Sequence, residues 1–208
     1  MIPIIFEVKR NVLEIGMRVT KEQFGQTREK ILAAASKLFL DKGFSGLGVA
    51  EVMNSAGYTH GGFYRHFQSK EHLTYETCKD LLEQTKENWK RTISQHPDSP
   101  LEALLDHYLT IERLFNADSP CIFSQFSEDL AGQSHEIREV FAKGLSDLRD
   151  LLMGIVSCTE VVDREQRALM ILSGMIGAAS LARSTNDPAF AEALLSAARQ
   201  KLFQDRAS

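Results

Sequence analysis

Residues 56–73 of this chain have the sequence AGYTHGGFYRHFQSKEHL. Thr59 is suited to begin a short helix that ends near residue 66, and Ser69 is suited to begin a longer one. Residues 49–56 form another short helical pattern, which Gly57 ends. Two short helices joined by a tight turn with glycine have the geometry of a helix-turn-helix unit. The second of them is the helix that such a unit offers to the DNA major groove.

The rest of the chain also shows helical periodicity. Apolar residues recur at intervals of three and four, as in Ile31, Ala34, Ala35, Leu38 and Phe39, and no segment alternates as a strand would. Glycine, proline and asparagine mark the breaks. The sequence therefore predicts an all-α fold. Nine helices are expected, over about residues 27–42, 49–56, 59–66, 69–96, 101–111, 122–130, 137–155, 163–183 and 188–203.

Composition describes a globular chain of 208 residues, 43% hydrophobic and 25% charged. The net charge of −4 is uneven, because residues 1–70 hold ten basic and six acidic residues, whereas residues 71–208 hold 14 and 22. A basic end and an acidic remainder suggest two roles on one chain. Three scattered cysteines form no disulfide framework, and no apolar run reaches the length of a membrane span, so a cytoplasmic protein without membrane contact is expected.

Sequence motifs for enzymes and metal sites are missing. No phosphate-binding loop, nucleophile elbow or dinucleotide-binding glycine pattern is present, and no Cys/His cluster has zinc spacing. We expect neither an enzyme, a catalytic residue, a metal nor a cofactor.

The string from Thr59 to Phe67, followed by Ser69-Lys70-Glu71, closely resembles the TetR (tetracycline-repressor-like) family of transcriptional regulators. Further matches are Gly43-Phe44, the run 49–53 and Ala56-Gly57. Beyond this region the likeness lies only in architecture and in a loose pattern. The resemblance implies a nine-helix TetR-like fold. Residues 1–24 would be an N-terminal arm (Met17 is a plausible true start), residues 25–70 a helix-turn-helix DNA-binding domain, and residues 71–208 a ligand-binding and dimerisation domain.

DNA-contacting residues are implied by the same resemblance. Phosphate contacts fall to Tyr64, His66 and Lys70, and base contacts to His60 and Gly61. Other expected DNA-binding residues are Thr59 as cap or phosphate donor, Gly62 for close approach, and Arg28 as a phosphate contact. Phe63 and Phe67 are expected in the core. At residues 48–50 the sequence is Gly-Val-Ala, which departs from the family and leaves the contribution of the second helix in doubt.

The acidic remainder is implied to hold a ligand pocket and a dimer interface. Gly174, Gly177 and Ala178 among large apolar residues favour close helix packing, which suits a bundle shared by two copies. The expected interface residues are Leu172, Gly174, Met175, Gly177, Ala178, Leu181, Leu194 and Ala198. The expected pocket residues are Trp89, His107, Tyr108, Phe115, Cys121, Phe123, Phe126 and Met153. His107 could instead lie on a solvated face, and each of the others could instead be buried in the core.

The function these residues indicate is a homodimeric repressor released from a pseudo-palindromic double-stranded DNA operator by an unknown small molecule. An alternative is ligand-independent regulation, or redox or electrophile sensing through Cys121, since a helix N-terminus lowers a thiol pKa. A non-specific architectural DNA-binding protein is another alternative, which the acidic remainder argues against. The sequence does not identify the operator, the effector or the target genes, and it does not distinguish a repressor from an activator.

Overall fold

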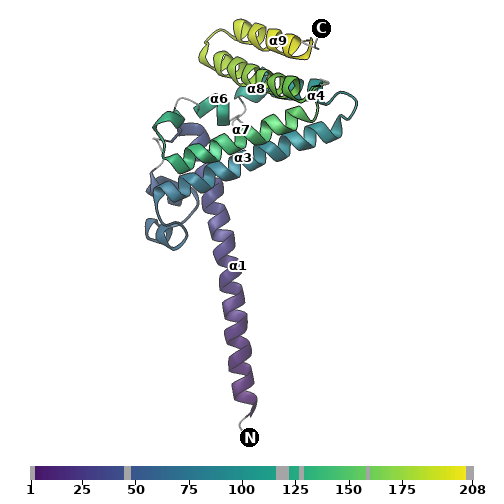
Figure 1. Ribbon diagram of the computed structural model, residues 1–208. Coiled ribbons are helices and arrows are strands. Elements are labelled where there is room, and N and C mark those ends of the chain that lie inside the picture. Colours follow the sequence, from purple (N-terminus) through teal and green to yellow (C-terminus); the bar gives the residue numbers. More distant parts are fainter. Residues whose placement is uncertain (1–2, 45–47, 116–121, 127–128, 158–159, 205–208) are drawn as a thin grey trace.

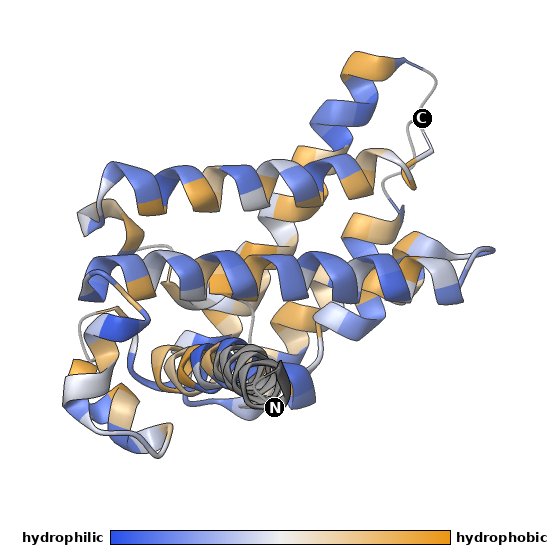
Figure 2. Cartoon of the chain, turned by 90° about the horizontal axis from the view of Figure 1, so that it is seen from below, coloured by the Kyte–Doolittle hydropathy of each residue, from blue (hydrophilic) through white to orange (hydrophobic). Residues whose placement is uncertain are grey.

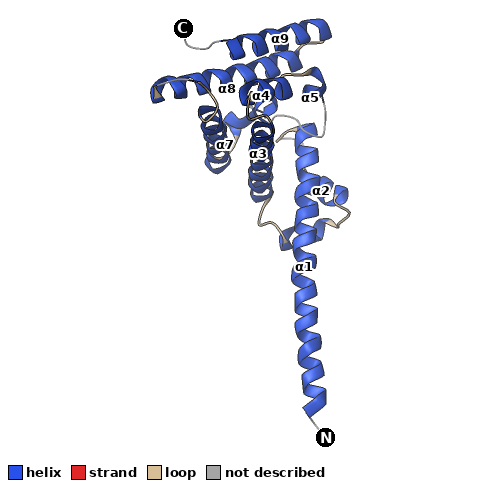
Figure 3. Ribbon diagram, turned by 90° about the vertical axis from the view of Figure 1, so that its right-hand side faces the viewer, coloured by secondary structure: helices blue, strands red, loops and turns tan. Residues whose placement is uncertain are grey.

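The computed structural model of the chain describes residues 3–44, 48–115, 122–126, 129–157 and 160–204, and side chains from residue 21 onward. Nine α-helices and two 3₁₀ helices make up this described part, which holds no strand (Figure 3). The predicted all-α fold is confirmed. The α-helices are α1 (Pro3–Lys42), α2 (Val49–Ser55), α3 (Lys70–Gln95), α4 (Pro100–Tyr108), α5 (Ile111–Phe115), α6 (Ile122–Phe126), α7 (His135–Met153), α8 (Val161–Ser184) and α9 (Pro188–Gln204), and the 3₁₀ helices are η1 (His60–Arg65) and η2 (Asp129–Gly132).

The helices are arranged in layers. Helices α8 and α9 lie side by side at one end of the molecule, and α3 and α7 run beneath them (Figure 1). The C-terminal part of α1, which is the upper part in Figure 1, packs with α2 and η1 at one end of α3. We call residues 27–67 the head and residues 100–204 the body; α3 joins them.

Several helix boundaries follow the sequence signals. The Oγ of Ser69 accepts a hydrogen bond from the His72 N–H at 3.0 Å, which caps α3. Asp187 Oδ1 accepts from the N–H groups of Ala189 and Phe190, and caps α9 with Pro188 at its first position. Gly43 ends α1 in the left-handed conformation at φ +71°, which a side chain disfavours.

Several helix boundaries differ from the prediction. The helix expected over residues 122–130 is shorter, since α6 ends at Phe126 and the 3₁₀ helix η2 covers Asp129–Gly132. Helix α1 begins at Pro3, so the expected arm is helical, and Thr27 lies inside the helix instead of capping it. The helix expected over residues 101–111 is divided, because the backbone leaves the helical region at Leu109 (φ −98°, ψ 61°) before α5 starts. In Figure 1, α1 extends well beyond the other helices.

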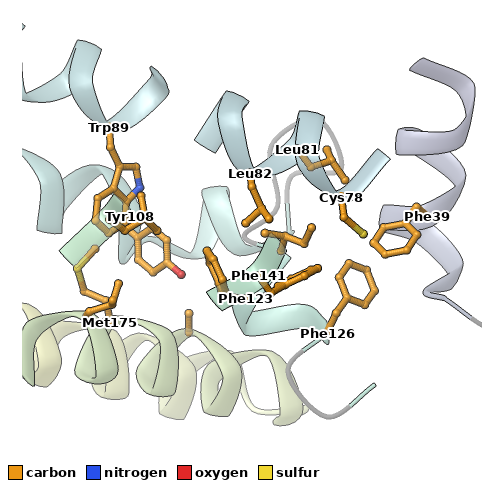
Figure 4. Packing of buried hydrophobic residues seen from close by; sticks show 14 of the residues in the cluster. Phe39, Cys78, Leu81, Leu82, Trp89, Tyr108, Phe123, Phe126, Phe141 and Met175 are labelled. Atoms are coloured by element: carbon orange, nitrogen blue, oxygen red, sulfur yellow. The ribbon is translucent and has the colours of Figure 1, made fainter. Parts of the chain in front are cut away.

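An apolar core links the head to the body. Phe39 of α1 meets Phe126 of α6, with ring centres 4.9 Å apart (Figure 4). The ring centre of Phe44 lies 4.4 Å from that of Phe39. Further along, Phe123 and Phe141 pack edge to face at 5.7 Å. The apolar faces of the helices turn toward this interior, and hydrophilic residues dominate the outer faces (Figure 2). Within the described residues, no helix combines the length and apolar character that a membrane span requires.

Candidate DNA-binding surface

The turn between α2 and η1 has the tight geometry that the sequence predicts. Gly57 is at φ +81°, a conformation that glycine adopts without strain. The Tyr58 N–H donates to the Met53 carbonyl at 2.8 Å, which folds the turn back onto α2. Gly62 lies against the same helix, since a Cβ there would sit 3.5 Å from Met53 Cε. The turn therefore holds η1 firmly against α2.

η1 has one buried and one exposed face. Phe63 and Phe67 are 0% and 1% exposed, and they anchor it in the head. Tyr64 is 66% exposed, and His60 is also exposed. Their rings meet edge to face at 6.4 Å, so both side chains lie together on the outer face. This pair is placed where a groove-binding helix would present its contacts.

Three other expected contacts lie beside this face. Thr59 is exposed, but its side chain makes no capping hydrogen bond, which leaves its hydroxyl available to a ligand. Gly61 has open space where a Cβ would stand. Lys70 is exposed in the first turn of α3, next to helix N–H groups that attract an anion. Thr59, Gly61 and Lys70 are thus accessible to solvent.

His66 is half-buried between η1 and α1. Its ring stacks on Phe24 with centres 4.2 Å apart, and its Nδ1 is buried without a hydrogen-bond partner. Burial of the ring, together with Arg65 and Arg28, lowers the pKa of His66 below its ordinary value. His66 is therefore neutral near pH 7, so any phosphate contact it makes is a neutral hydrogen bond.

Arg28 does not lie on this surface as a free cation. Its Nη2 is 3.2 Å from Glu76 Oε2 of α3, and its guanidinium covers the Phe67 ring. These contacts give Arg28 a role in packing the head against α3, and its expected phosphate contact stays a prediction. Arg65, which the sequence reasoning missed, is the exposed cation at the end of η1. Its position next to Tyr64 was the available signal.

Helix α2 presents little to a ligand. Gly48 precedes it without a side-chain cap, Ala50 is exposed, and Glu51 forms an ion pair with Lys42 of α1. The sequence departs from the family at residues 48–50, and the first turn of α2 accordingly has no cation or hydroxyl group that could bind a phosphate.

The comparisons with known proteins identify this region. A family model described as "Bacterial regulatory proteins, tetR family" matches residues 31–76, which run from α1 through η1 into α3. The chain carries a TetR-family domain. It is 26% identical over 137 residues to the transcriptional repressor NemR of Escherichia coli K12, covering 61% of this chain and 65% of NemR. It is 28% identical over 152 residues to the repressor KstR2 of Mycolicibacterium smegmatis, covering 73% and 65%. These matches span about 65% of the length of each curated relative.

Solved structures show the same fold over a larger share of the chain than the sequence matches do. The reduced form of E. coli NemR superposes with a TM-score of 0.72 at 21% identity, covering 85% of this chain and 95% of that one. A TetR-family regulator from Cytophaga hutchinsonii gives a TM-score of 0.73 at 13% identity, covering 89% and 98%. The architecture of the body is therefore that of the family, although its sequence has diverged.

The expected pocket residues lie mainly in the core. Trp89 and Tyr108 are 1% and 2% exposed and pack edge to face at 6.0 Å, and Met153 is half-buried. Phe123 and Phe126 belong to the aromatic core described above. The side chain of Phe115 and all of Cys121 lie outside the described residues.

Two grooves of ligand size border the body. One, of about 850 Å³, runs between α3 and α7 and is lined by none of the expected pocket residues. Another, of about 620 Å³, is lined by His107 and Arg113 and lies where α3 ends and α4 begins. Arg113 Nη1 is 2.8 Å from His107 Nε2, and burial together with this guanidinium lowers the pKa of His107. In the described part of the chain, no group of three or more His, Cys, Asp or Glu residues is placed to hold a metal.

The expected dimer residues divide into two sets. Leu172 and Met175 are buried within one chain, and Gly174 packs against Leu202 of α9. Ala178, Leu194 and Ala198 are half-buried, Gly177 faces open space, and Leu181 is 58% exposed. Two apolar residues that the sequence reasoning missed, Met170 of α8 and Phe190 of α9, are 66% and 57% exposed. No sequence signal showed which side of so apolar a helix would stay uncovered.

Proposed function

We propose that the chain is a homodimeric transcriptional repressor that binds a pseudo-palindromic DNA operator and leaves it when a small molecule binds the body. The observation that carries this proposal is that Tyr64 and His60 are exposed together on the outer face of η1, and that Lys70 is exposed at the capped start of α3. Phosphate contacts from the tyrosine, lysine and helix N-terminus would set the position on the duplex, and His60 would read bases.

A two-fold dimer is the second part of the proposal. One η1 reads a single half-site, and two heads spaced by about one helical turn address both halves of a palindrome. The exposed apolar residues of α8 and α9 support pairing through these helices. In this view residues 25–70 read DNA, and residues 71–208 bind the effector and the second subunit.

Effector release would operate through linkage between two sites. A molecule that binds the body more tightly in the DNA-free arrangement must weaken DNA binding by the same free energy, commonly about 1–3 kcal/mol. The expected pocket residues around Trp89 and Tyr108 and the two grooves beside α3 are the places to look for it.

Fluorescence anisotropy tests the proposal directly. The dimer is titrated against its own upstream intergenic DNA and against a scrambled duplex of equal length at one salt concentration. Tight binding to the native DNA alone supports a specific regulator. If the upstream DNA binds no better than the scrambled duplex, selection from a random library decides: enrichment of a palindrome sustains the proposal, and no enrichment refutes it.

Sensing through Cys121 is the alternative, and one observation bears on it. Burial raises the pKa of the Cys78 thiol to about 12, so this cysteine is a poor nucleophile at neutral pH. A thiol oxidant should therefore act through another cysteine if it acts at all. Loss of DNA binding with diamide in the wild type and in Cys78→Ser, but not in Cys121→Ser, would establish this route. Diamide resistance of the wild type would exclude it.

A further inference from the structure

Helix α3 contacts both the head and the body. Its first two turns pack on the head, where Leu73 and Cys78 are buried and Glu76 pairs with Arg28 of α1. Its later turns lie against α7 and α4. The place of the head relative to the body therefore depends on where α3 rests on α7.

The two helices approach closely at one glycine. A Cβ added to Gly144 of α7 would lie 2.8 Å from Cδ2 of Leu82 and 3.3 Å from its Cδ1 and Cγ. Leu82 is 7% exposed, and both residues also line the groove of about 850 Å³ between α3 and α7. A glycine inside a helix costs about 1 kcal/mol relative to alanine. Here the missing side chain lets α7 come closer to α3 than any other residue would allow.

An ion pair joins the same two helices one turn further on. Lys86 Nζ lies 3.1 Å from Asp147 Oδ2, and the two side chains are only 25% and 16% exposed. Lys143, also on α7, hydrogen-bonds Asp147 and, with Lys86, lowers the pKa of this carboxyl. Asp147 is therefore ionised at neutral pH. Leu82 and Lys86 lie on one face of α3, four residues apart, so the steric contact and the ion pair are neighbours.

We infer that the Gly144–Leu82 contact and the Lys86–Asp147 pair position α3 on the body and thereby set the separation of the two DNA-reading heads. This inference rests on the proposed function. The contact fixes the distance between the helix axes, and the ion pair fixes their relative slide. Gly144, Leu82, Lys86 and Asp147 are positioning residues, since none of them lies on the face proposed to contact DNA.

The contact lies far along α3 from the head, so a small tilt of α3 there moves the head by a larger distance. Ser69 is 13 residues before Leu82 on the same helix, which is about 20 Å at 1.5 Å per residue. A tilt of about 5° over that length moves the head by about 1.7 Å, and two-fold symmetry doubles this to about 3.5 Å. One base-pair step is about 3.4 Å. A small change at Gly144 should therefore change which operator spacing is preferred.

The test compares operator spacings. An operator is selected from a random duplex library with the wild-type dimer, and versions with one base pair added or removed at its centre are made. For each protein, the Kd for the parent operator is divided by the Kd for an operator of altered spacing. Relative to the wild type, Gly144→Ala should change this ratio about tenfold for one of the two altered operators. Leu82→Ala in the same chain removes the atoms that the new methyl group meets, and should bring the ratio back to within about threefold of wild type.

Matched variants separate positioning from general damage. Asp147→Asn breaks the pair between helices and should shift the ratio about threefold, whereas Lys90→Gln, which removes an exposed pair with Glu87 within α3, should leave it unchanged.

The outcomes are distinct. No palindrome selected by the wild type would refute the proposed function itself. A folded, dimeric Gly144→Ala protein with the wild-type ratio would overturn the inference, as would an equal shift in Lys90→Gln. If Gly144→Ala fails to fold, Leu82→Ala alone decides. Loosening the contact should reduce the difference between parent and altered spacings, so the ratio of their Kd values should move toward one by at least about threefold.

Discussion

The guanidinium carbon of Arg28 lies 5.0 Å from the centre of the Phe67 ring. Its Nη2 also reaches Glu76 of α3, at 3.2 Å. One arginine thus joins α1, the aromatic residue Phe67 that follows η1, and α3, the helix that connects the head and the body. A cation over an aromatic ring and a partly buried ion pair each contribute on the order of 0.5–1 kcal/mol.

Replacing Arg28 should therefore affect stability more than DNA contact. Arg28→Ala is expected to lower the free energy of unfolding by about 1–2 kcal/mol, measured by urea denaturation. It should leave unchanged the slope of log K for DNA against log salt, because no phosphate contact is lost. A slope that falls by about 0.9 would instead place Arg28 on a phosphate.

Lys70 and Tyr64 should behave in the opposite way. Lys70→Ala is expected to reduce the salt slope by about 0.9 and to weaken binding to all operators alike, because one phosphate contact is lost. Tyr64→Phe should weaken binding by a similar factor with no change in slope, since it removes a neutral hydroxyl. Lys90→Ala is the control, since Lys90 is exposed on the same helix and pairs with Glu87.

Sequence preference should depend on His60. His60→Ala is expected to change the ranking of operator variants, by about 1–3 kcal/mol at the contacted base pair. An unchanged ranking in a binding-competent variant would place base reading elsewhere on η1, with exposed Arg65 next to be tested.

The features that the sequence predicts correctly are mainly helix ends and turns, because these depend on residues next to one another in the chain. The caps at Ser69 and Asp187 and the turn at Gly57 depend on neighbouring residues, and the structure has all three. Leu109 ends α4 without a glycine or proline beside it, so no local signal marked that break. The contacts of Arg28 with Phe67 and Glu76 join residues far apart in the chain, and only the fold brings them together.

The lowered pKa of His66 predicts a pH dependence. The folded pKa lies below the unfolded value of about 6.5, so the unfolded state takes up the proton first. The stability contribution of neutral His66 is complete above that value and is lost as pH falls through the lower, folded pKa. The stability difference between wild type and His66→Gln should therefore shrink between about pH 7 and pH 5.

NMR titration of the His66 ring adds a test of its contact with DNA. A phosphate beside the ring favours the charged form, so operator DNA should raise the pKa of His66 if the proposed contact exists. The same titration with a scrambled duplex is the control. A pKa that operator DNA leaves unchanged would place His66 in the packing of Phe24 alone.

Phe126 should control the connection between head and body. It is 3% exposed and meets Phe39 and Phe44, with ring centres 4.9 and 5.8 Å away. Phe126→Ala is expected to cost about 3–5 kcal/mol of stability, because it leaves a cavity between α6 and the head. Hydrogen exchange should quicken first in α1 and α2. Quickening confined to α8 and α9 would contradict this role.

The exposed apolar stripe of α8 should be where two chains meet. Met170, Ser173, Gly177 and Leu181 follow one another at helical spacing, and the first and last are 66% and 58% exposed. Large residues at both ends and a glycine facing open space between them suit two helices that cross near Gly177. Leu181→Glu would place an unpaired carboxylate in that contact, which costs several kcal/mol when buried.

We therefore expect Leu181→Glu to raise the Kd of the dimer at least about a hundredfold, measured by mass photometry over a dilution series. Val162→Glu is the control, because Val162 is 66% exposed at the far end of the same helix, outside the stripe. The monomer should keep its helical spectrum and bind half-site and full-site duplexes alike, since a single η1 can read only one half. A dimer that survives Leu181→Glu and dissociates with Val162→Glu would move the interface to the start of α8.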